Sequence, residues 1–442
     1  MEWIGIIALF GSFAIFLALG VPISFAIGLS SVIALVAANM VFGTPLPVAL
    51  DESTFTLAQR MASGLDSFPL LAIPFFILAG NIMNSGGIAT RLIDFAKVLV
   101  GRMPGSLAHC NIASNMLFGA ISGSAVASAA AVGGVMAPLQ KKEGYEPAFS
   151  AAVNISSCPT GLLIPPSNTF IVYSLVSGGT SVGALFLAGY LPGIIMGLGL
   201  MLVAGIYAVR HNYPIAEKVT FNAAIQYTIR AIPSLLLIVL VMGGIITGKV
   251  TPTEASAAAV VYALFLSFVY KEIRIGDLPK IILESVITTS IVLLLIGTSM
   301  GMQFAMVMTD IPFIIANSLT SLSENKYVLL LIITFVLLLV GTFMDMTPAL
   351  LIFTPIFLPI AQDLGMDPVH FGVFITFNLC IGICTPPVGS ALFIGSSIAK
   401  VRLDEVIPKL LPFYAVLVVA LLLVTYIPAI SLALPRLFGM MG

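Results

Sequence analysis

Long apolar runs alternate with short polar connections over almost the whole chain. A helix needs about 20 apolar residues to cross a bilayer. Uninterrupted runs of this kind predict spanning helices at residues 3–20, 22–42, 68–86, 184–208, 232–248, 253–270, 286–308 and 411–434. Two amphipathic stretches, 88–102 and 271–284, are typical of helices that lie at the membrane interface.

Four further apolar segments are long enough to cross a membrane but are broken near their middles. They are residues 106–138, 148–178, 327–361 and 369–398. The corresponding breaks are Ser122-Gly123-Ser124, Pro165-Pro166, Asp345-Met346-Thr347-Pro348 and Pro386-Pro387. Irregular backbone at membrane depth is tolerated where it is buried in protein or lines a cavity. We therefore expect all four breaks to lie at an internal site.

The second half of the chain repeats unusual residues of the first half at a constant spacing of 221. The matched pairs are Gly80 and Gly301, Pro138 and Pro359, Gly144 and Gly365, Glu146-Pro147 and Asp367-Pro368, Gly161 and Gly382, and Pro165-Pro166 and Pro386-Pro387. So many matches in one register indicate an internal duplication. We predict a first repeat at 1–208, a linker at 209–230 and a second repeat at 231–442.

The basic residues indicate that the two repeats have opposite orientations in the membrane. Residues 91–102 contain three basic side chains, whereas the matching residues 312–323 contain none. Conversely, Lys400 and Arg402 match uncharged positions in the first repeat. Because cytoplasmic loops carry an excess of Lys and Arg, matched loops should lie on opposite sides of the membrane. The sequence therefore predicts an inverted repeat.

This topology determines what the broken segments are. The basic linker around Arg210, Lys218 and Arg230 should be cytoplasmic, and both termini should lie outside. Basic residues flank 106–138 on both sides, so this segment should enter from the cytoplasm and return. Residues 327–361 should form the matching re-entrant hairpin from the opposite side, with Asp345 at the position that corresponds to Ser124.

The composition agrees with an all-α integral membrane protein. Of 442 residues, 59% are hydrophobic and 8% are charged, and the mean hydropathy is +1.14. Soluble domains have about 25% charged residues, so lipid must be the main solvent. The four cysteines lie in apolar segments without metal-ligand spacing, and no P-loop motif is present. We expect no cofactor, no nucleic-acid partner and no direct drive by ATP.

The two Pro-Pro pairs predict a binding site for a carboxylate and a binding site for a cation. Pro suits the first turn of a helix, so Pro166 and Pro387 are expected to begin the second half of each broken helix. The positive end of such a half-helix stabilises a carboxylate. The carbonyl oxygens at the end of the preceding half suit a cation such as Na⁺. The alternative is that these prolines are kinks that serve only packing, but their duplication beside the hairpins favours a functional role.

The hairpin tips supply further oxygen atoms. Ser122 and Ser124 are candidates for ion or substrate contact, although small residues here also suit close helix packing. Asp345 is the only carboxylate in 327–361, and a charge at mid-membrane costs about 2.5–3.5 kcal/mol. It should pair with a cation, a proton or a partner, unless it lies at a wet hairpin mouth. Thr347 offers a second oxygen. Candidate substrate contacts beyond the breaks are Ser167, Asn168, Thr169, Thr385 and Ser390.

At these residues the sequence resembles the large membrane subunit of tripartite ATP-independent periplasmic (TRAP) transporters. The matching stretches are LLAIPFFILAGNIMNSGGI at 70–88, FGAISGSAVASAAAVG at 118–133, GLLIPPSNTFIVY at 161–173 and GICTPPVGSALFIG at 382–395. The resemblance extends over essentially the whole chain. It implies an elevator-type transporter of the bacterial inner membrane that is driven by a Na⁺ gradient. It also implies two partners, a periplasmic substrate-binding protein and a small four-helix membrane subunit.

The same resemblance implies small organic anions as cargo, such as dicarboxylates, sialic acid and other carboxylates. Sodium sites in this family join a hairpin tip to the unwound helix of the same repeat. The corresponding residues here are Ser122 and Ser124 with Gly161, and Asp345 and Thr347 with Gly382. A self-sufficient Na⁺/carboxylate symporter of the same architecture is the alternative. An intramembrane enzyme is not expected, because one isolated deep Asp is not a catalytic set.

Overall fold

A computed structural model of the chain describes residues 2–215, 220–323 and 325–441, so Lys218 of the linker lies outside the described residues. The described residues form helices joined by short loops and contain no β-strand. Nine of these helices are long and apolar enough to cross a membrane. The predicted all-α membrane fold is confirmed.

The first half contains α1 (Glu2–Ile6), α2 (Ser12–Ala18), α3 (Ile23–Val41), α4 (Leu46–Leu65), α5 (Ala72–Ser85), α6 (Ile88–Val100), α7 (Ser106–Ser122), α8 (Ala125–Lys142), α9 (Pro147–Ser157), α10 (Thr160–Leu163), α11 (Asn168–Val176) and α12 (Val182–Arg210). The second half contains α13 (Phe221–Ile246), α14 (Pro252–Val269), α15 (Leu278–Met308), α16 (Ile311–Leu322), α17 (Lys326–Phe343), α18 (Met346–Asp363), α19 (Pro368–Gly382), α20 (Ser390–Ala399), α21 (Leu403–Tyr426) and α22 (Pro428–Leu437).

Both predicted hairpins are present, and their helices begin at matched positions. Hairpin 1 is α7–α8 and hairpin 2 is α17–α18. The second helix begins at Ala125 in hairpin 1 and at Met346 in hairpin 2, and 346 − 125 = 221. The helix that follows begins at Pro147 in the first half and at Pro368 in the second, and 368 − 147 = 221. The repeat boundaries at 208 and 231, and the opposite orientations of the halves in a membrane, stay predictions.

Both broken helices are present as well, but their second halves do not begin at the prolines. The peptide bonds Pro165–Pro166 and Pro386–Pro387 are cis and lie within the breaks. The second halves begin two or three residues later, at Asn168 in α11 and at Ser390 in α20. The residues before them, Ser167 and Gly389, have non-helical backbone angles and occupy the N-cap positions. The expectation that Pro166 and Pro387 start these helices was therefore wrong.

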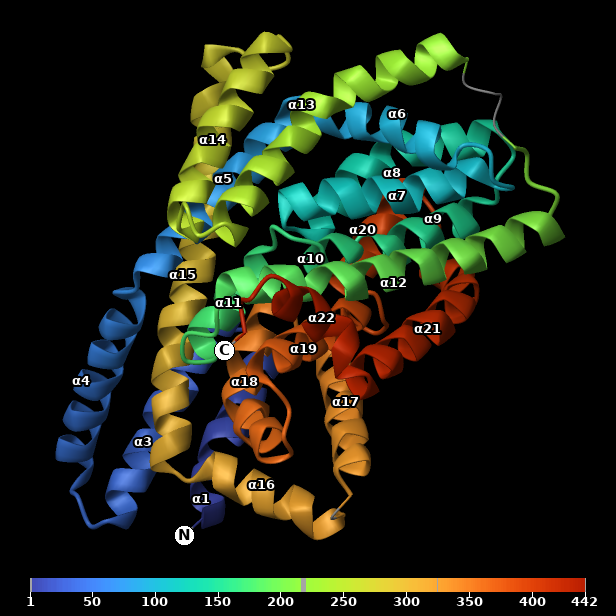
Figure 1. Ribbon diagram of the computed structural model, residues 1–442. Helices are drawn as coiled ribbons and strands as arrows, with labels where there is room; N and C mark the ends of the chain where they lie inside the picture. The colour runs from blue at the N-terminus through green and yellow to red at the C-terminus, as the bar shows by residue number, and fades with distance from the viewer. Residues whose placement is uncertain (1, 216–219, 324, 442) are drawn as a thin grey trace.

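The helices form two groups that lie side by side (Figure 1). On the left of the view, α3, α4, α5, α14 and α15 run roughly parallel or antiparallel to one another, and we call this group the helical column. On the right, the two hairpins pack with the broken helices and with α12 and α21, and we call this group the hairpin bundle. The tips of both hairpins reach the boundary between the two groups.

Three expectations about individual helices need correction. Residues 278–284 are not a separate interfacial helix but the first turns of α15, which begins with Pro279 in its first turn. The predicted span 411–434 ends early at Tyr426, because Pro428 disfavours helical backbone at Ile427. The helix α4 was missed, because its acidic and polar residues interrupt the apolar pattern.

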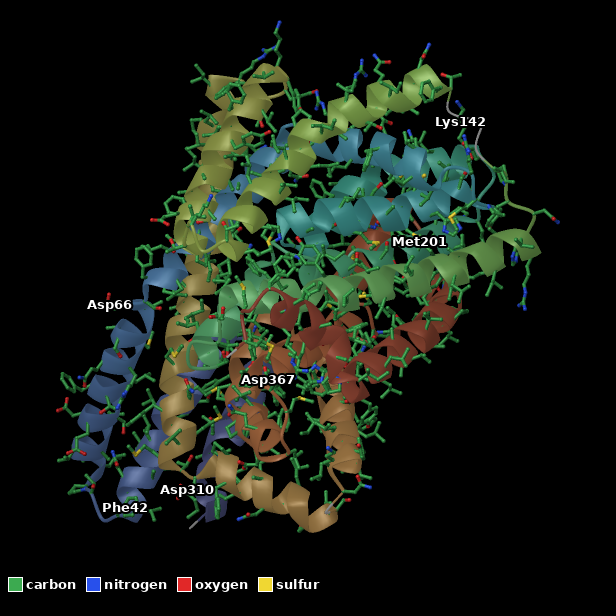
Figure 2. The ribbon with its side chains drawn as sticks, in the orientation of Figure 1. Phe42, Asp66, Lys142, Met201, Asp310 and Asp367 are labelled. Atoms are coloured by element: carbon green, nitrogen blue, oxygen red, sulfur yellow. The ribbon has the colours of Figure 1, made fainter. Side chains whose placement is uncertain are left out.

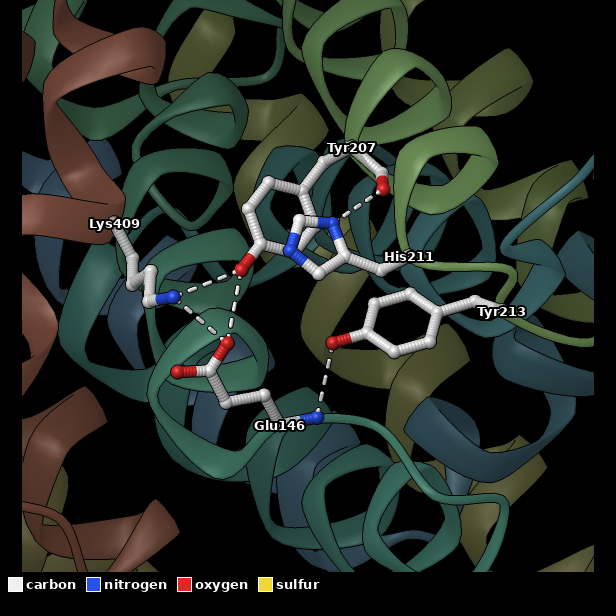
Figure 3. Close-up of polar contacts among 5 residues, drawn as sticks. All are labelled: Glu146, Tyr207, His211, Tyr213 and Lys409. Carbon is white, nitrogen blue, oxygen red and sulfur yellow. Dashed lines mark hydrogen bonds and ion pairs between the residues drawn. The ribbon is translucent and has the colours of Figure 1, made fainter.

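A polar cluster at the start of α9 joins the two halves of the chain (Figure 3). Glu146 forms a 2.8 Å ion pair with Lys409 of α21 and accepts a 2.8 Å hydrogen bond from the Tyr207 hydroxyl of α12. The His211 ring stacks on Tyr207 with ring centres 3.9 Å apart. Burial alone would raise the pKa of Glu146, but the hydrogen bonds from Lys409 and Tyr207 outweigh this and lower it. The cluster therefore favours a charged Glu146 that ties α9 to α21.

Charged residues mark two opposite ends of the molecule, which gives a test of membrane topology. In Figure 2, Lys142 lies at the upper right, whereas Asp310 lies near the bottom. We expect a cysteine at exposed Ser321, on α16, to react with an impermeant maleimide on intact cells. A cysteine at exposed Arg102 should react only after the membrane is opened. The four native cysteines are buried and give a low background. Reaction of both positions on intact cells would contradict the inverted repeat.

Candidate functional site

One cavity lies where the two hairpin tips meet the helical column. Its volume is about 280 Å³. Residues from both hairpins, both broken helices, α5 and α15 line it. The predicted site residues among them are Ser122, Ser124, Asn168, Thr169, Asp345, Thr347 and Ser390. The fold thus brings together residues that are up to 268 positions apart in the chain, counted from Ser122 to Ser390 (390 − 122). We call this space the central cavity.

The tip of hairpin 1 is a tight turn with its polar atoms at the cavity. Gly123 ends α7 in the left-handed backbone region with φ = +62°, which favours glycine. Ser124 then caps α8, because its Oγ accepts a 3.2 Å hydrogen bond from the Ala127 N–H. The Ser122 Oγ donates weakly to the Ser124 carbonyl oxygen at 3.4 Å. Ser122 is thus nearly free to bind a ligand, whereas Ser124 also holds the turn.

The tip of hairpin 2 places Asp345 at the N-cap of α18. Its carboxylate does not cap the helix, and Oδ1 instead accepts a 3.2 Å hydrogen bond from the Ser390 Oγ of α20. The side chain is exposed to the cavity. Pairing of Asp345 with a cation, a proton or a partner stays a prediction. Thr347, one residue into the helix, lines the same cavity.

The first broken helix touches both tips. A Cβ on Gly123 would lie 2.9 Å from the Asn168 Nδ2, so α11 begins directly against the turn of hairpin 1. The Thr169 Oγ1 lies 3.3 Å from the Met346 Sδ of hairpin 2. No side chain caps the N-terminus of α11, α18 or α20. Uncapped helix N-termini carry free N–H groups that attract anions.

Two predicted substrate residues lie away from the cavity. The Ser167 Oγ is fully buried and donates a 2.6 Å hydrogen bond to the Leu162 carbonyl oxygen. The Thr385 Oγ1 donates to the Ile381 carbonyl oxygen at 2.7 Å. The Leu162 carbonyl lacks a helical partner, because Pro166 four residues later has no N–H, whereas the Ile381 carbonyl also accepts a 3.1 Å hydrogen bond from the Cys384 N–H. The structure gives these residues a role in holding the breaks and does not place them among the residues that line the cavity.

Gly161 and Gly382 are not among the residues that line the central cavity, and each lies where a broken helix packs against a hairpin. A Cβ on Gly161 would be 2.2 Å from the Gly119 Cα of hairpin 1. In the second half, a Cβ on Gly382 would be 2.5 Å from the Gly341 Cα of hairpin 2. Each hairpin therefore packs on its broken helix through a contact between two glycine backbones. Sodium binding by the carbonyls of Gly161 and Gly382 stays a prediction.

The helical column contributes a wall of the cavity that was not predicted from the sequence. Gly80 and Asn81 of α5 and Thr288 of α15 line the cavity. A Cβ on Gly80 would lie 3.0 Å from the Ser122 carbonyl oxygen, so α5 passes close to the tip of hairpin 1. The Asn81 Nδ2 donates a 2.8 Å hydrogen bond to the Ser285 Oγ of α15. Asn81 is one of two amides, with Asn84, in the apolar run of α5, which was a usable but weak signal.

The charge balance of the cavity restricts its ligands. Asp345 is the one carboxylate among the described lining residues, and none of these is Lys, Arg or His. An anion that enters would meet a like charge without a basic side chain to offset it. The arrangement therefore fits an anionic ligand only when a cation accompanies it.

Both the sequence and the fold are similar to those of known proteins. The profile of the tripartite ATP-independent periplasmic transporter DctM component matches residues 10–430. The chain is 61% identical over 434 residues to the uncharacterized protein YgiK of Salmonella typhimurium, and the match covers 98% of both chains. It is 41% identical over 390 residues to the C4-dicarboxylate TRAP transporter large permease protein DctM of Pseudomonas aeruginosa, covering 88% of this chain and 91% of that one. The fold is similar to the YdaH transporter of Alcanivorax borkumensis, with a TM-score of 0.62, 14% identity, and coverage of 85% of this chain and 88% of that chain.

Proposed function

The chain belongs to the DctM component family of tripartite ATP-independent periplasmic (TRAP) transporters, and we propose that it couples uptake of small organic carboxylates to a Na⁺ gradient. As a member of this family it is a multi-pass transport protein of the bacterial inner membrane and not an enzyme. The coupling ion and the cargo go beyond family membership and are our proposal.

The observation that carries the proposal is the chemistry of the central cavity. Three uncapped helix N-termini favour a carboxylate there, whereas the Asp345 carboxylate opposes it. A bound Na⁺ removes this conflict, since it is attracted to Asp345 and offsets the charge of the substrate. Binding of each ion then improves binding of the other, which is the thermodynamic requirement for coupled transport.

We assign the residues to two kinds of contact. Na⁺ would bind at the hairpin tips through Ser122, Ser124, Asp345 and Thr347, with carbonyl oxygens near Gly161 and Gly382 behind them. The substrate carboxylate would bind the N-terminal ends of α11 and α20, next to Asn168, Thr169 and Ser390. Oxygen atoms are the ligands that hard cations prefer. Carriage of the loaded site across the membrane by an elevator movement of the hairpin bundle is part of the same proposal.

Family membership supports the cargo class and the partners that we propose. The relative from Pseudomonas aeruginosa carries the name of a C4-dicarboxylate transporter, which supports a small carboxylate as cargo. We propose that a periplasmic binding protein delivers this cargo and that a small membrane subunit completes the transporter.

Reconstitution tests the proposal. We expect uptake of a radiolabelled organic acid into proteoliposomes when this chain, the small subunit and the loaded binding protein are combined under an inward Na⁺ gradient. Replacing the Na⁺ gradient by a K⁺ gradient should abolish uptake, and so should omission of either partner. Uptake by the chain alone would favour a self-sufficient symporter. Uptake that ignores Na⁺ would contradict the proposed coupling.

A further inference from the structure

A cluster of buried polar side chains lies inside hairpin 1, about two helical turns from its tip. Its members are Asn111 and Asn115 of α7, Ser128 of α8, and Asn154 and Ser157 of α9, and each is buried. The Asn115 Nδ2 lies 2.7 Å from the Ser157 Oγ, 3.1 Å from the Asn154 Oδ1 and 2.8 Å from the Asn111 Oδ1. The Asn115 Oδ1 accepts a 2.7 Å hydrogen bond from the Ser128 Oγ. We call these residues the amide cluster.

The amide cluster joins both helices of hairpin 1 to the first half of the broken helix. The Asn154 Nδ2 donates a further hydrogen bond of 3.0 Å to the Ala129 carbonyl oxygen of α8. A Cβ on Gly133 of α8 would lie 2.2 Å from the same Nδ2, so the glycine leaves room for the amide. A buried network of bonded polar groups fixes the relative position of the elements that it connects. The cluster therefore sets how hairpin 1 lies on α9.

The cluster also lies against the contact between hairpin 1 and the break of the broken helix. A Cβ on Gly119 would lie 3.4 Å from the Ser128 Oγ and 2.8 Å from the Gly161 Cα. Ser128 is one helical turn after Ser124, which caps α8 at the tip (128 − 124 = 4). The bonds of the cluster thus determine where Ser124 lies relative to Gly161.

The second repeat builds the same packing without such a cluster. The residues 221 positions after the cluster are Ile332, Val336, Ala349, Ile375 and Asn378. Hairpin 2 packs on α19 through α17, as hairpin 1 packs on α9 through α7. Within the described part of hairpin 2, no side-chain hydrogen bond reaches α19, and the Asn378 Nδ2 donates to the Phe374 carbonyl oxygen of its own helix. The packing of a hairpin on its broken helix therefore does not require the amide cluster.

The two hairpin tips differ in charge as well. The tip of hairpin 2 carries the Asp345 carboxylate, whereas the tip of hairpin 1 offers the neutral hydroxyls of Ser122 and Ser124. A carboxylate attracts a cation over several ångströms, so it tolerates a loose arrangement of the other ligands. Neutral oxygens lack this attraction, and they bind well only when they are held in place before the ion arrives. A rigid support is thus needed in the first repeat and not in the second.

We propose that Asn115 is a positioning residue for Na⁺ binding at the tip of hairpin 1. Through the amide cluster it holds the tip against the first broken helix, so that Ser122 and Ser124 are preorganised for the ion. Asn115 is not among the residues that line the central cavity, so its effect on the ion passes through the tip. The inference rests on the proposed coupling to Na⁺ and names a residue on which that coupling depends.

Two variants test the cluster in the complete transporter. The first is Asn115→Ala. The second gives the cluster the residues of the second repeat and combines Asn111→Ile, Asn115→Val, Ser128→Ala and Asn154→Ile. In both we expect the Na⁺ concentration for half-maximal uptake to rise about fivefold. Maximal uptake at saturating Na⁺ and the thermal midpoint should stay close to those of the wild type.

The matched control is Thr334→Val in hairpin 2. Thr334 is also buried, but its Oγ1 donates to the Leu330 carbonyl oxygen of its own helix at 2.8 Å. The substitution removes a buried hydroxyl without breaking a bond between elements. It should leave the Na⁺ dependence unchanged.

The outcomes separate this inference from the proposed function. A folded variant with unchanged Na⁺ dependence would overturn the inference, and so would a lower maximal rate at unchanged Na⁺ dependence. Loss of the fold in both variants would also overturn it, because the cluster would then be required for folding. If uptake by the wild type ignores Na⁺, the proposed coupling fails and the inference fails with it.

Discussion

Replacing Asp345 with asparagine is expected to raise the Na⁺ concentration for half-maximal uptake at least tenfold, which corresponds to about 1.4 kcal/mol. The substitution keeps the size of the side chain and removes the charge that attracts the cation. Neutral oxygens, including that of Thr347, remain at the tip, so Na⁺ binding should weaken and not disappear. The Asp345 carboxylate does not cap α18, so the helix should keep its N-terminus.

The controls for this experiment separate charge from hydrogen bonding. Ser390→Ala removes the hydrogen bond to Asp345 but keeps the carboxylate, and it should change the Na⁺ dependence much less. Ser124→Ala, at the corresponding position of hairpin 1, should also do less, because it removes a neutral ligand. Protein level and assembly with the small subunit are measured in parallel. An unchanged Na⁺ dependence in Asp345→Asn would remove Asp345 from the ion site.

Replacing Gly161 with alanine is expected to abolish uptake and to lower the thermal midpoint of the purified protein. The added Cβ would lie 2.2 Å from the Gly119 Cα. Because this clash involves the backbones of both elements, it can be relieved only if hairpin 1 moves away from the broken helix. Overpacking usually lowers the free energy of unfolding by about 1–3 kcal/mol. We expect a clash between two backbones to cause a loss at the upper end of this range. The displaced tip would also carry Ser122 away from the cavity.

The matched control for this substitution is Gly134→Ala. Gly134 lies in α8 of the same hairpin, and a Cβ there would meet nothing within 4 Å. It should therefore be neutral or slightly stabilising, since alanine favours helix over glycine. Gly382→Ala should reproduce the defect in the second repeat, where the Cβ would lie 2.5 Å from the Gly341 Cα. A normal thermal midpoint and normal uptake in Gly161→Ala would show that the glycine contact is not needed.

The arrangement of elements was predictable because its signals are local and repeated. The conformation of the nearby backbone is determined by runs of apolar residues, by turn glycines such as Gly123 and by the two Pro-Pro pairs. The duplication supplied two examples of each signal. The hairpin tips could therefore be placed to within a few residues. Seven of the proposed contact residues line one cavity, because the tips of both hairpins and the breaks of both broken helices meet beside α5 and α15.

The details that the sequence did not reveal have both local and non-local causes. Ser167 and Thr385 lie beside helix breaks, and sequence alone does not reveal that their hydroxyls bond to the carbonyls of Leu162 and Ile381. Asn81 reaches the cavity only because α5 crosses the tip of hairpin 1, which is a non-local contact. The helix α4 escaped detection for a different reason, since its polar face lacks the hydropathy that identifies a span.

The most direct test of the central claim asks whether Na⁺ binds in the cavity between the hairpin tips. Val126 lines this cavity, is 38% exposed and has no proposed contact with the ion. In Val126→Cys, the rate of alkylation by a small thiol reagent can be compared in Na⁺ and in K⁺ at equal ionic strength. We predict slower alkylation in Na⁺, and loss of this protection when Asp345→Asn is added. Equal rates in Na⁺ and K⁺ would contradict a sodium site in the central cavity.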